Sequence, residues 1–247
     1  MSGHSKWATT HRQKAVVDAK RGAIFTKIGN QIAIAARAGT DPTMNSSLAM
    51  AIEKAKAANM PAANIQRAID RVADKNSAAL EEITYEGYGP GGVGIIIETA
   101  TDNRNRTLPE VKLALTKNGG SMADAGSVTF QFDRKGVIRV AASGEEALLQ
   151  VLDAGAEDAV EADGKLIVYT GMKDLASVRK ALLDAGMTIE EAELQYIAKN
   201  DVPISDAETA RKVIKIIDAL DDLDDVVNVY TNADITADIN QGSAGPP

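Results

Sequence analysis

Cationic and hydrogen-bonding residues gather near the N-terminus, where they could contact phosphate groups. The set comprises, in chain order, His4, Ser5, Lys6, Trp7, His11, Arg12, Lys14, Lys20, Arg21 and Lys27. Clustered cations neutralise phosphates, hydroxyl groups donate hydrogen bonds to them, and an indole ring can stack on a base. We therefore interpret the set as a polyanion-binding segment, while Trp7 taken alone fits better as an anchor onto the neighbouring helices.

A second pair of cations, Arg104 and Arg106, lies between an expected strand and the start of an expected helix, within Thr101–Thr107. The free N–H groups and the dipole at a helix N-terminus favour an anion, and two arginines add to that preference. A purely structural loop held by Asp102 and the asparagine side chains is an equally weighted alternative. The pair is thus a candidate nucleic-acid contact.

Several kinds of site chemistry lack their residues. The chain has no cysteine and two histidines, which argues against thiolate nucleophiles, zinc fingers, a buried Ser-His-Asp triad and multi-histidine metal centres. The Gly89–Gly92 loop lacks the Lys-Ser/Thr of a phosphate-binding loop and predicts a tight hairpin. The acidic run Asp221–Asp225 predicts a solvated turn, not a metal site. We expect no enzyme activity, no cofactor, no metal and no small-molecule substrate.

The charge is strongly polarised along the 247 residues. The net charge is −8, yet residues 1–75 hold 12 Lys or Arg against five Asp or Glu, a net +7, and the remainder carries −15. Such a field can orient a protein on a polyanion. No apolar run approaches the roughly 20 residues of a membrane helix, and the polar, basic start is unlike a secretory signal. We expect a soluble cytoplasmic protein that does not enter membranes.

Residues 1–80 are predicted to form a helical basic domain. Apolar residues recur with a helical period over 24–36, and Gly22 is expected to interrupt that helix. Asn45-Ser46-Ser47 offers caps for a second helix, and Pro61 lies near the start of a third. The prediction is a small three-helix domain.

Beyond residue 80 the apolar period changes to that of strands. Strands are predicted over 83–88, 93–100 and 128–132, with a helix opened by a capping box at Thr107–Glu110. A later helix begins at Ser205-Asp206, and a strand covers 226–230. These elements predict one discontinuous α+β domain built from 81–133 and 203–232.

Residues 134–202 read as a complete unit inserted into that domain. Strands are expected at 137–141, 158–162, 166–170 and up to Tyr196, with an Asp163-Gly164 hairpin turn. One helix follows a capping box at Ser143–Glu146, and another ends at Gly186. The order β-α-β-β-α-β is ferredoxin-like. The expected fold class is α+β. It comprises an N-terminal three-helix domain, two α+β domains of which the ferredoxin-like one is inserted into the other, and a flexible tail over 233–247.

Several segments together resemble the YebC/PmpR family from end to end. They are MSGHSKW at 1–7, DAKRG at 18–22, IFTK at 24–27, AIEKAKAANMP at 51–61, YEGYGPGG at 85–92, TDNRNRT at 101–107 and VNVYTN at 227–232. The resemblance implies a three-domain α+β protein with a helical N-terminal domain. Bacterial members are described as DNA-binding transcriptional regulators, a mitochondrial relative activates translation, and others aid ribosomes on proline-rich sequences.

Three functional hypotheses follow. The first is a non-enzymatic regulator of gene expression that binds nucleic acid through residues 1–75, most simply a DNA-binding transcriptional regulator. The second is a ribosome-associated translation factor with the same segment on rRNA or tRNA. The third and weakest is a protein-interaction scaffold. No recognition helix is identifiable, and the few aromatic residues argue against a base-stacking sheet.

Overall fold

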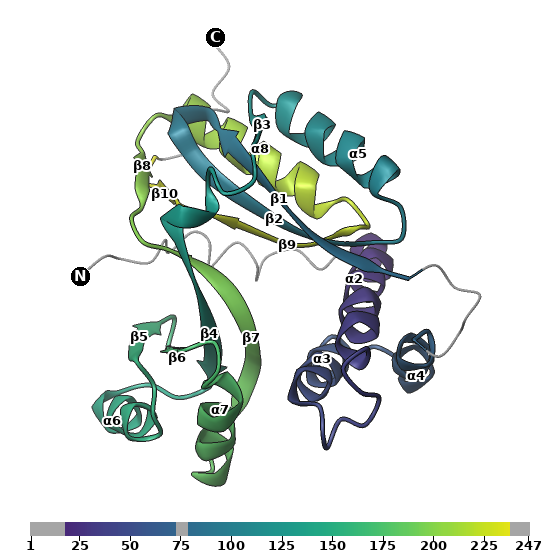
Figure 1. Cartoon of the computed structure of the whole chain (residues 1–247). Coiled ribbons are helices and arrows are strands. Elements are labelled where there is room, and N and C mark those ends of the chain that lie inside the picture. The colour runs from purple at the N-terminus through teal and green to yellow at the C-terminus, as the bar shows by residue number, and fades with distance from the viewer. Residues whose placement is uncertain (1–17, 73–78, 238–247) are drawn as a thin grey trace. The chain divides into compact units, whose positions relative to one another are not determined.

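The computed structural model describes residues 18–72 and 79–237 (Figure 1). The described residues divide into two compact units. One combines 18–30, 79–133 and 197–237, and the other combines 31–72 and 134–196. The architecture is α+β, with a helical N-terminal part and two four-stranded sheets, as predicted. Among the described helices, none is long and apolar enough to cross a membrane.

Three helices make up the N-terminal part: α2 (Asp18–Ala36), α3 (Ser46–Ala57) and α4 (Ala62–Asp70). Asn45 caps α3 by accepting a hydrogen bond from Leu48 N at 3.1 Å, and its amide donates to the carbonyl oxygens of Ala35 in α2 and of Gly39 in the turn that follows. One predicted cap is therefore confirmed, and it also fixes the turn between two helices.

The predicted interruption at Gly22 is wrong. Helix α2 runs unbroken from Asp18 to Ala36. Ile28, Ile32 and Ala36 are buried on one face, so packing of that face outweighs the low helix propensity of a single glycine.

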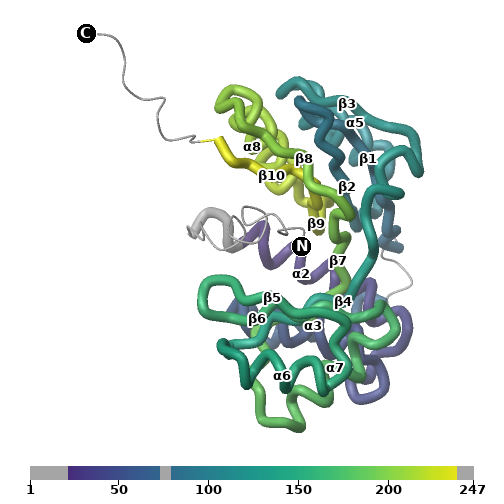
Figure 2. Tube along the Cα trace, turned by 90° about the vertical axis from the view of Figure 1, so that its left-hand side faces the viewer, coloured from purple at the N-terminus to yellow at the C-terminus, as the bar shows by residue number. Residues whose placement is uncertain are grey.

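The first sheet contains strands from both sides of the inserted segment. Its spatial order is β3 (Ser121–Ala123), β1 (Glu81–Gly89), β2 (Val93–Thr101) and β9 (Val226–Thr231), all antiparallel. A short parallel pair joins β8 (Val202–Ile204) to β10 (Ala233–Ile235) in a second ladder, visible beside α8 in Figure 2. The chain thus leaves this sheet after β3 and returns to it at β9.

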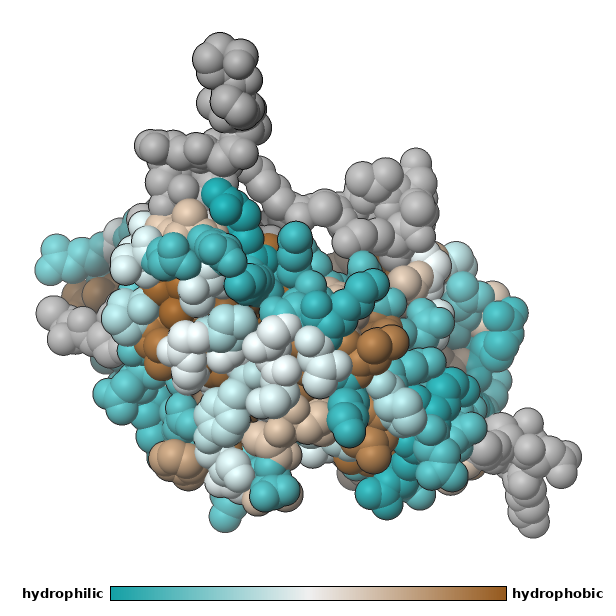
Figure 3. All heavy atoms as spheres, turned by 90° about the horizontal axis from the view of Figure 1, so that it is seen from above, coloured by the Kyte–Doolittle hydropathy of each residue, from teal (hydrophilic) through white to brown (hydrophobic). Residues whose placement is uncertain are grey.

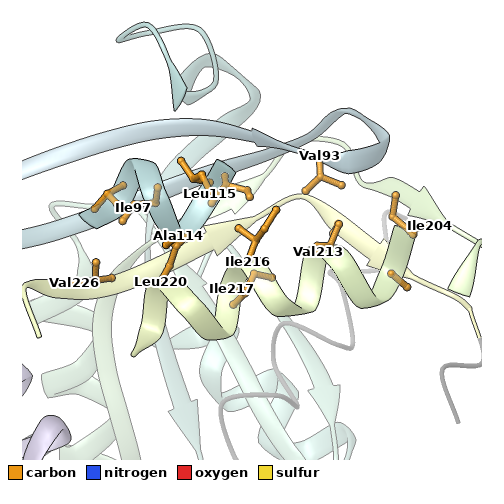
Figure 4. Packing of buried hydrophobic residues seen from close by; sticks show 14 residues of the cluster. Val93, Ile97, Ala114, Leu115, Ile204, Val213, Ile216, Ile217, Leu220 and Val226 are labelled. Carbon is orange, nitrogen blue, oxygen red and sulfur yellow. The ribbon is translucent and has the colours of Figure 1, made fainter. Parts of the chain in front are cut away.

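Helices α5 (Arg104–Thr116) and α8 (Ala207–Asp221) cover one face of this sheet. Figure 4 shows Val213, Ile216 and Leu220 of α8 directed toward the strands and α5. Opposite them lie the odd-numbered β2 residues from Val93 to Ile97, all fully buried. Each such side chain contributes about 1.5–3 kcal/mol by leaving water, so this layer is the main source of stability in the unit.

The second sheet has the predicted element order. Its strands are arranged as β5 (Asp158–Ala162), β6 (Lys165–Thr170), β4 (Phe132–Val140) and β7 (Ile189–Ala198). Helices α6 (Glu145–Asp153) and α7 (Leu175–Asp184) pack on one face through a shared buried cluster (Figure 2). Asp163 and Gly164 both have positive φ, as the predicted hairpin turn requires.

Two predicted capping boxes are wrong. Helix α5 begins at Arg104, with Asn103 as its cap, so Thr107 lies inside the first two turns. Helix α6 begins after Gly144, which has φ 91° and no side-chain cap; the Gly144 N–H donates to Glu161 instead. The cap of α5 thus lies one turn before the predicted box, and the cap position of α6 is held by a glycine without a side-chain hydrogen bond.

The predicted strand over 128–132 is also wrong. Residues Thr129–Gln131 form a single 3-10 turn, and β4 begins only at Phe132. The N–H groups of Val128 and Thr129 donate to the carboxylate of Glu86, which removes them from any strand ladder. The three-residue strands β3, β8 and β10 were not predicted, because three residues show no clear period.

Candidate nucleic-acid interface

The predicted basic set falls mostly outside the described residues. His4, Ser5, Lys6, Trp7, His11, Arg12 and Lys14 all lie there. Lys20 and Arg21 lie on the first turn of α2, and their side chains are likewise outside the description. Helix α2 therefore continues directly from the basic segment, and it places two of the predicted cations on a regular helix.

Lys27 has a structural contact within the first unit. Its ammonium donates a hydrogen bond to the main-chain carbonyl oxygen of Asp221, the last residue of α8. A cation at a helix C-terminus interacts favourably with the helix dipole and with carbonyl groups that lack a partner in the helix. This side chain thus stabilises a helix end in the described structure.

Other cations of the helical part are exposed or paired. Arg37, Lys56 and Arg67 are exposed to solvent. Lys54 pairs with Glu193 at 2.5 Å and Glu191 at 3.4 Å on β7, and Glu53 pairs with Arg179 on α7. The exposed cations extend the basic character beyond α2, whereas the charge of Lys54 is neutralised inside the second unit.

The second predicted pair surrounds a buried carboxylate. Asp225, at the start of β9, is 7% exposed and accepts hydrogen bonds from the hydroxyls of Thr101 (3.0 Å) and Thr107 (2.7 Å). Arg106 Nη2 lies 2.8 Å from both carboxylate oxygens of Asp225 and 3.3 Å from Asp102 Oδ1. One side chain thereby joins the end of β2, the start of α5 and the start of β9.

The electrostatics of this cluster follow from its contacts. Burial raises the pKa of Asp225, but hydrogen bonds from Thr107, Arg106 and Thr101 outweigh it, so the pKa lies below the ordinary value. The hydrogen bond and the charge of Asp225, with a smaller contribution from Asp102, raise the pKa of Arg106. Asp225 is therefore ionised and paired. The prediction of a solvated acidic turn over Asp221–Asp225 is wrong for Asp225, which is buried. Asp221, Asp222 and Asp224 are exposed, as that prediction expects.

The two arginines have different surroundings. Arg106 forms ion pairs with Asp225 and Asp102. These contacts favour the alternative interpretation of this loop, in which its side chains have a structural role. Arg104 has a side chain that is 67% exposed, and its nearest carboxylate, Glu81, lies at 4.0 Å. The pKa of the nearby Tyr85 hydroxyl lies above its ordinary value, because burial raises it by more than Arg104 lowers it. Arg104 is thus the member of the pair that is accessible to a phosphate.

A second buried carboxylate, Glu86, was missed by the sequence analysis. Its oxygens accept from Gly126 N (2.6 Å), Val128 N (2.5 Å), Thr129 N (2.9 Å) and Thr129 Oγ1 (2.6 Å). Burial raises its pKa, yet these donors together lower it below the ordinary value. The sequence offers little signal for it, because β1 contains three glutamates and only Glu86 is buried.

No metal site is found in the described part of the chain. There, no group of three His, Cys, Asp or Glu side chains has a geometry that could hold a metal ion. The face seen from above in Figure 3 is covered mainly by hydrophilic side chains, with apolar residues in separate patches. Within the described residues, the candidates for binding a ligand are therefore the exposed lysine and arginine side chains, which bind anionic groups.

Models of one protein family match nearly the whole chain. The model described as "TACO1/YebC protein N-terminal domain" matches residues 5–75, and "TACO1/YebC second and third domain" matches residues 80–233. The boundary between the two models coincides with the start of the first sheet.

Relatives are similar over almost their full length. Proteins from Moorella thermoacetica and Thermobifida fusca, each named "Probable transcriptional regulatory protein", are 51% identical, with 97% of this chain and 98% of theirs aligned. A crystal structure of a conserved hypothetical protein, Aq1575, from Aquifex aeolicus has a TM-score of 0.86 and 43% identity, covering 92% of this chain and 96% of that one.

Proposed function

Since the chain belongs to the TACO1/YebC family, we propose that it is a non-enzymatic, nucleic-acid-binding regulator of gene expression, most simply a DNA-binding transcriptional regulator. The printed names of relatives at 51% identity support regulation of transcription. The observation that carries nucleic-acid binding is the charge of +7 over residues 1–75 in a chain whose remainder carries −15. The proposal places the protein in the cytoplasm, without a cofactor or small-molecule substrate.

Phosphate contact is the mechanism in this proposal. Lysine and arginine side chains of residues 1–27 neutralise phosphates and release counterions, which supplies affinity without sequence preference. The acidic remainder repels the same polyanion, so the protein binds in one orientation. Lys20 and Arg21 belong to this segment and occupy successive positions of helix α2.

A ribosome-associated translation factor is the second candidate. The observation in its favour is Arg104, an exposed cation outside the helical part that could contact a second phosphate. A large ribonucleoprotein surface engages two separate patches together, and the two weak contacts then multiply. A short DNA duplex bound by residues 1–27 alone does not need Arg104.

Recovery of the native protein from cells tests the two candidates. The lysate is divided into one portion sedimented through sucrose to collect ribosomes and one cross-linked to genomic DNA, and the protein is quantified in both. Enrichment on particular promoter fragments supports the transcriptional role, and RNase-sensitive sedimentation with ribosomes supports the translational role. A protein that is free in both assays contradicts the proposal.

The matched variant replaces Lys6, Arg12, Lys14, Lys20 and Arg21 with alanine in the full chain. We expect this head variant to be lost from whichever fraction holds the wild type. The control removes five cations that are exposed elsewhere, namely Lys173, Lys180, Arg211, Lys212 and Lys215. It has the same net charge as the head variant and should be retained.

A further inference from the structure

The solvent face of α5 is cationic and apolar, although residues 76–247 together carry a net charge of −15. Arg104, Leu108 and Lys112 follow one another at intervals of four residues, and all three are exposed. Leu108 is 44% exposed, and Leu113 on the adjacent row is 63% exposed. The one acidic residue of the helix, Glu110, is half-buried, so the exposed positions of α5 include no carboxylate.

The solvent face of α6 has the opposite charge with the same spacing. Glu145, Leu149 and Asp153 are exposed and again lie four residues apart. Leu149 is 57% exposed and Leu152 is 40% exposed. The helix contains no lysine or arginine. Each helix therefore has an exposed leucine between two charges of one sign.

The two rows match in length as well as in charge. Residues at i, i+4 and i+8 lie along one inclined row of a helix surface, and the rise of 1.5 Å per residue separates the end residues by about 12 Å. When the leucines are opposed, both end charges of one row meet opposite charges of the other. The match holds for parallel and antiparallel helices, because the two ends of each row have the same sign.

We propose that these two faces bind each other between two copies of this chain, with α5 of one copy packed on α6 of the other. A reciprocal pair of such contacts closes as a twofold dimer, whereas a single contact repeated head to tail does not close. Leucines at the centre and charges at the margin are the usual anatomy of a protein interface. A polynucleotide is a poorer occupant of α5, because exposed leucines gain little beside phosphates.

The charges on both faces are available for a partner. Within the described residues, Lys112, Glu145 and Asp153 make no ion pair. Arg104 lies 4.0 Å from Glu81, and both side chains are more than half exposed, so that pair is weak and exchangeable. Forming the interface therefore breaks no buried contact.

Sedimentation equilibrium of the full chain without nucleic acid tests the proposal. Nucleic acid is left out because Arg104 also belongs to the proposed nucleic-acid contacts. Over a series reaching about 100 μM, which detects a micromolar dissociation constant, we expect the wild type to shift from monomer to dimer. A wild type that stays monomeric throughout the series overturns the proposal.

Charge reversal identifies the faces. The α5 variant is Arg104→Glu with Lys112→Glu, and the α6 variant is Glu145→Lys with Asp153→Lys. Each alone should lose at least tenfold in self-association, because like charges then oppose one another at both contacts. An equimolar mixture should dimerise again, since each mixed pair has one original and one exchanged contact, both attractive.

Two further measurements keep the test interpretable. The exposed pair Arg211→Glu with Lys215→Glu on α8 has the same charge change as the α5 variant and should dimerise as the wild type does. Leu108→Ser changes no charge and should weaken the dimer. Failure of the mixture to associate, with both variants folded by circular dichroism, overturns the assignment of these faces.

Discussion

At the scale of single residues, two buried carboxylates organise the loops of the first unit. Asp225 collects two threonine hydroxyls and one guanidinium, and Glu86 collects three main-chain N–H groups and one hydroxyl. Buried charges are tolerated when hydrogen bonds satisfy their oxygens, and removing such an acceptor leaves its donors without partners. Both residues are therefore structural, although their types alone would suggest a chemical role.

Substitution of Asp225 tests its structural role. We expect Asp225→Ala to lower the free energy of unfolding by about 2–3 kcal/mol, because Thr101, Thr107 and Arg106 lose a charged acceptor. Asp224→Ala, at the exposed neighbouring position, should change it by less than about 0.5 kcal/mol. Urea unfolding monitored by circular dichroism measures both, and equal effects would contradict the assignment.

Glu86 should make stability depend on pH in the acidic range. Its pKa is lowered in the folded state, so its stabilisation is present above its unfolded pKa and is lost as the pH falls through its folded pKa. We expect the unfolding free energy of the wild type to fall below about pH 5. Glu86→Gln should be less stable at pH 7 and show a shallower decline below pH 5. Parallel pH profiles for the two proteins would contradict this.

At the scale of elements, the start of α5 shows how a local signal can be misread. Thr107-Leu108-Pro109-Glu110 has the residues of a capping box, but Asn103 caps the helix one turn earlier and accepts from Arg106 N at 3.2 Å. The hydroxyl of Thr107 is drawn to Asp225, a residue 118 positions away in the sequence. A distant partner therefore decided between two locally plausible helix starts.

The cap of α5 gives a prediction at this scale. We expect Asn103→Ala to cost about 1 kcal/mol of stability, and Asn103→Asp to cost much less, since aspartate also accepts from the N–H groups of the first turn. Thr116→Ala, near the other end of α5, serves as the control because its hydroxyl bonds only within the helix. The measurement is the midpoint of thermal unfolding. An equal shift for the alanine and aspartate variants would show that the cap is not stabilising.

Elements of six or more residues were largely predictable, and contacts between distant segments were not. The helices α7 and α8 show clear apolar periods that mark their buried faces, and the strands β2 and β6 show nearly continuous apolar runs, in agreement with their burial along almost their whole length. The 3-10 turn at Thr129–Gln131 was not predictable, because its cause is Glu86, about 40 residues earlier. For the candidate site, residue types indicated anion binding, but only the structure separated exposed Arg104 from paired Arg106.

At the scale of the whole molecule, the distribution of charge carries the functional account. A chain with net charge −8 would be expected to avoid polyanions, yet its first 75 residues carry +7. Long-range electrostatics sets the orientation and the rate of encounter with a polyanion, and phosphate contacts supply the affinity. The domain boundaries at residues 80, 133 and 202 remain predictions.

The absence of a catalytic role is a separate prediction for the whole chain. We expect the purified protein to show no turnover of DNA, RNA or nucleoside triphosphates above a buffer blank, because no acid–base pair was identified for such chemistry. Product formation followed by chromatography measures this. Turnover that is abolished by substitution of one carboxylate would contradict it.

The salt dependence of polynucleotide binding tests the central claim most directly. The logarithm of the binding constant is measured against the logarithm of salt concentration for duplex DNA and for ribosomes, with the wild type, the head variant and the control variant that lacks five exposed cations elsewhere. We expect the head variant to bind more weakly and its slope to be shallower by about 0.7–0.9 per lost contact, while the control variant keeps the wild-type slope. A head variant with the affinity and slope of the wild type on both targets would show that the basic segment is a solvated surface and would contradict the account.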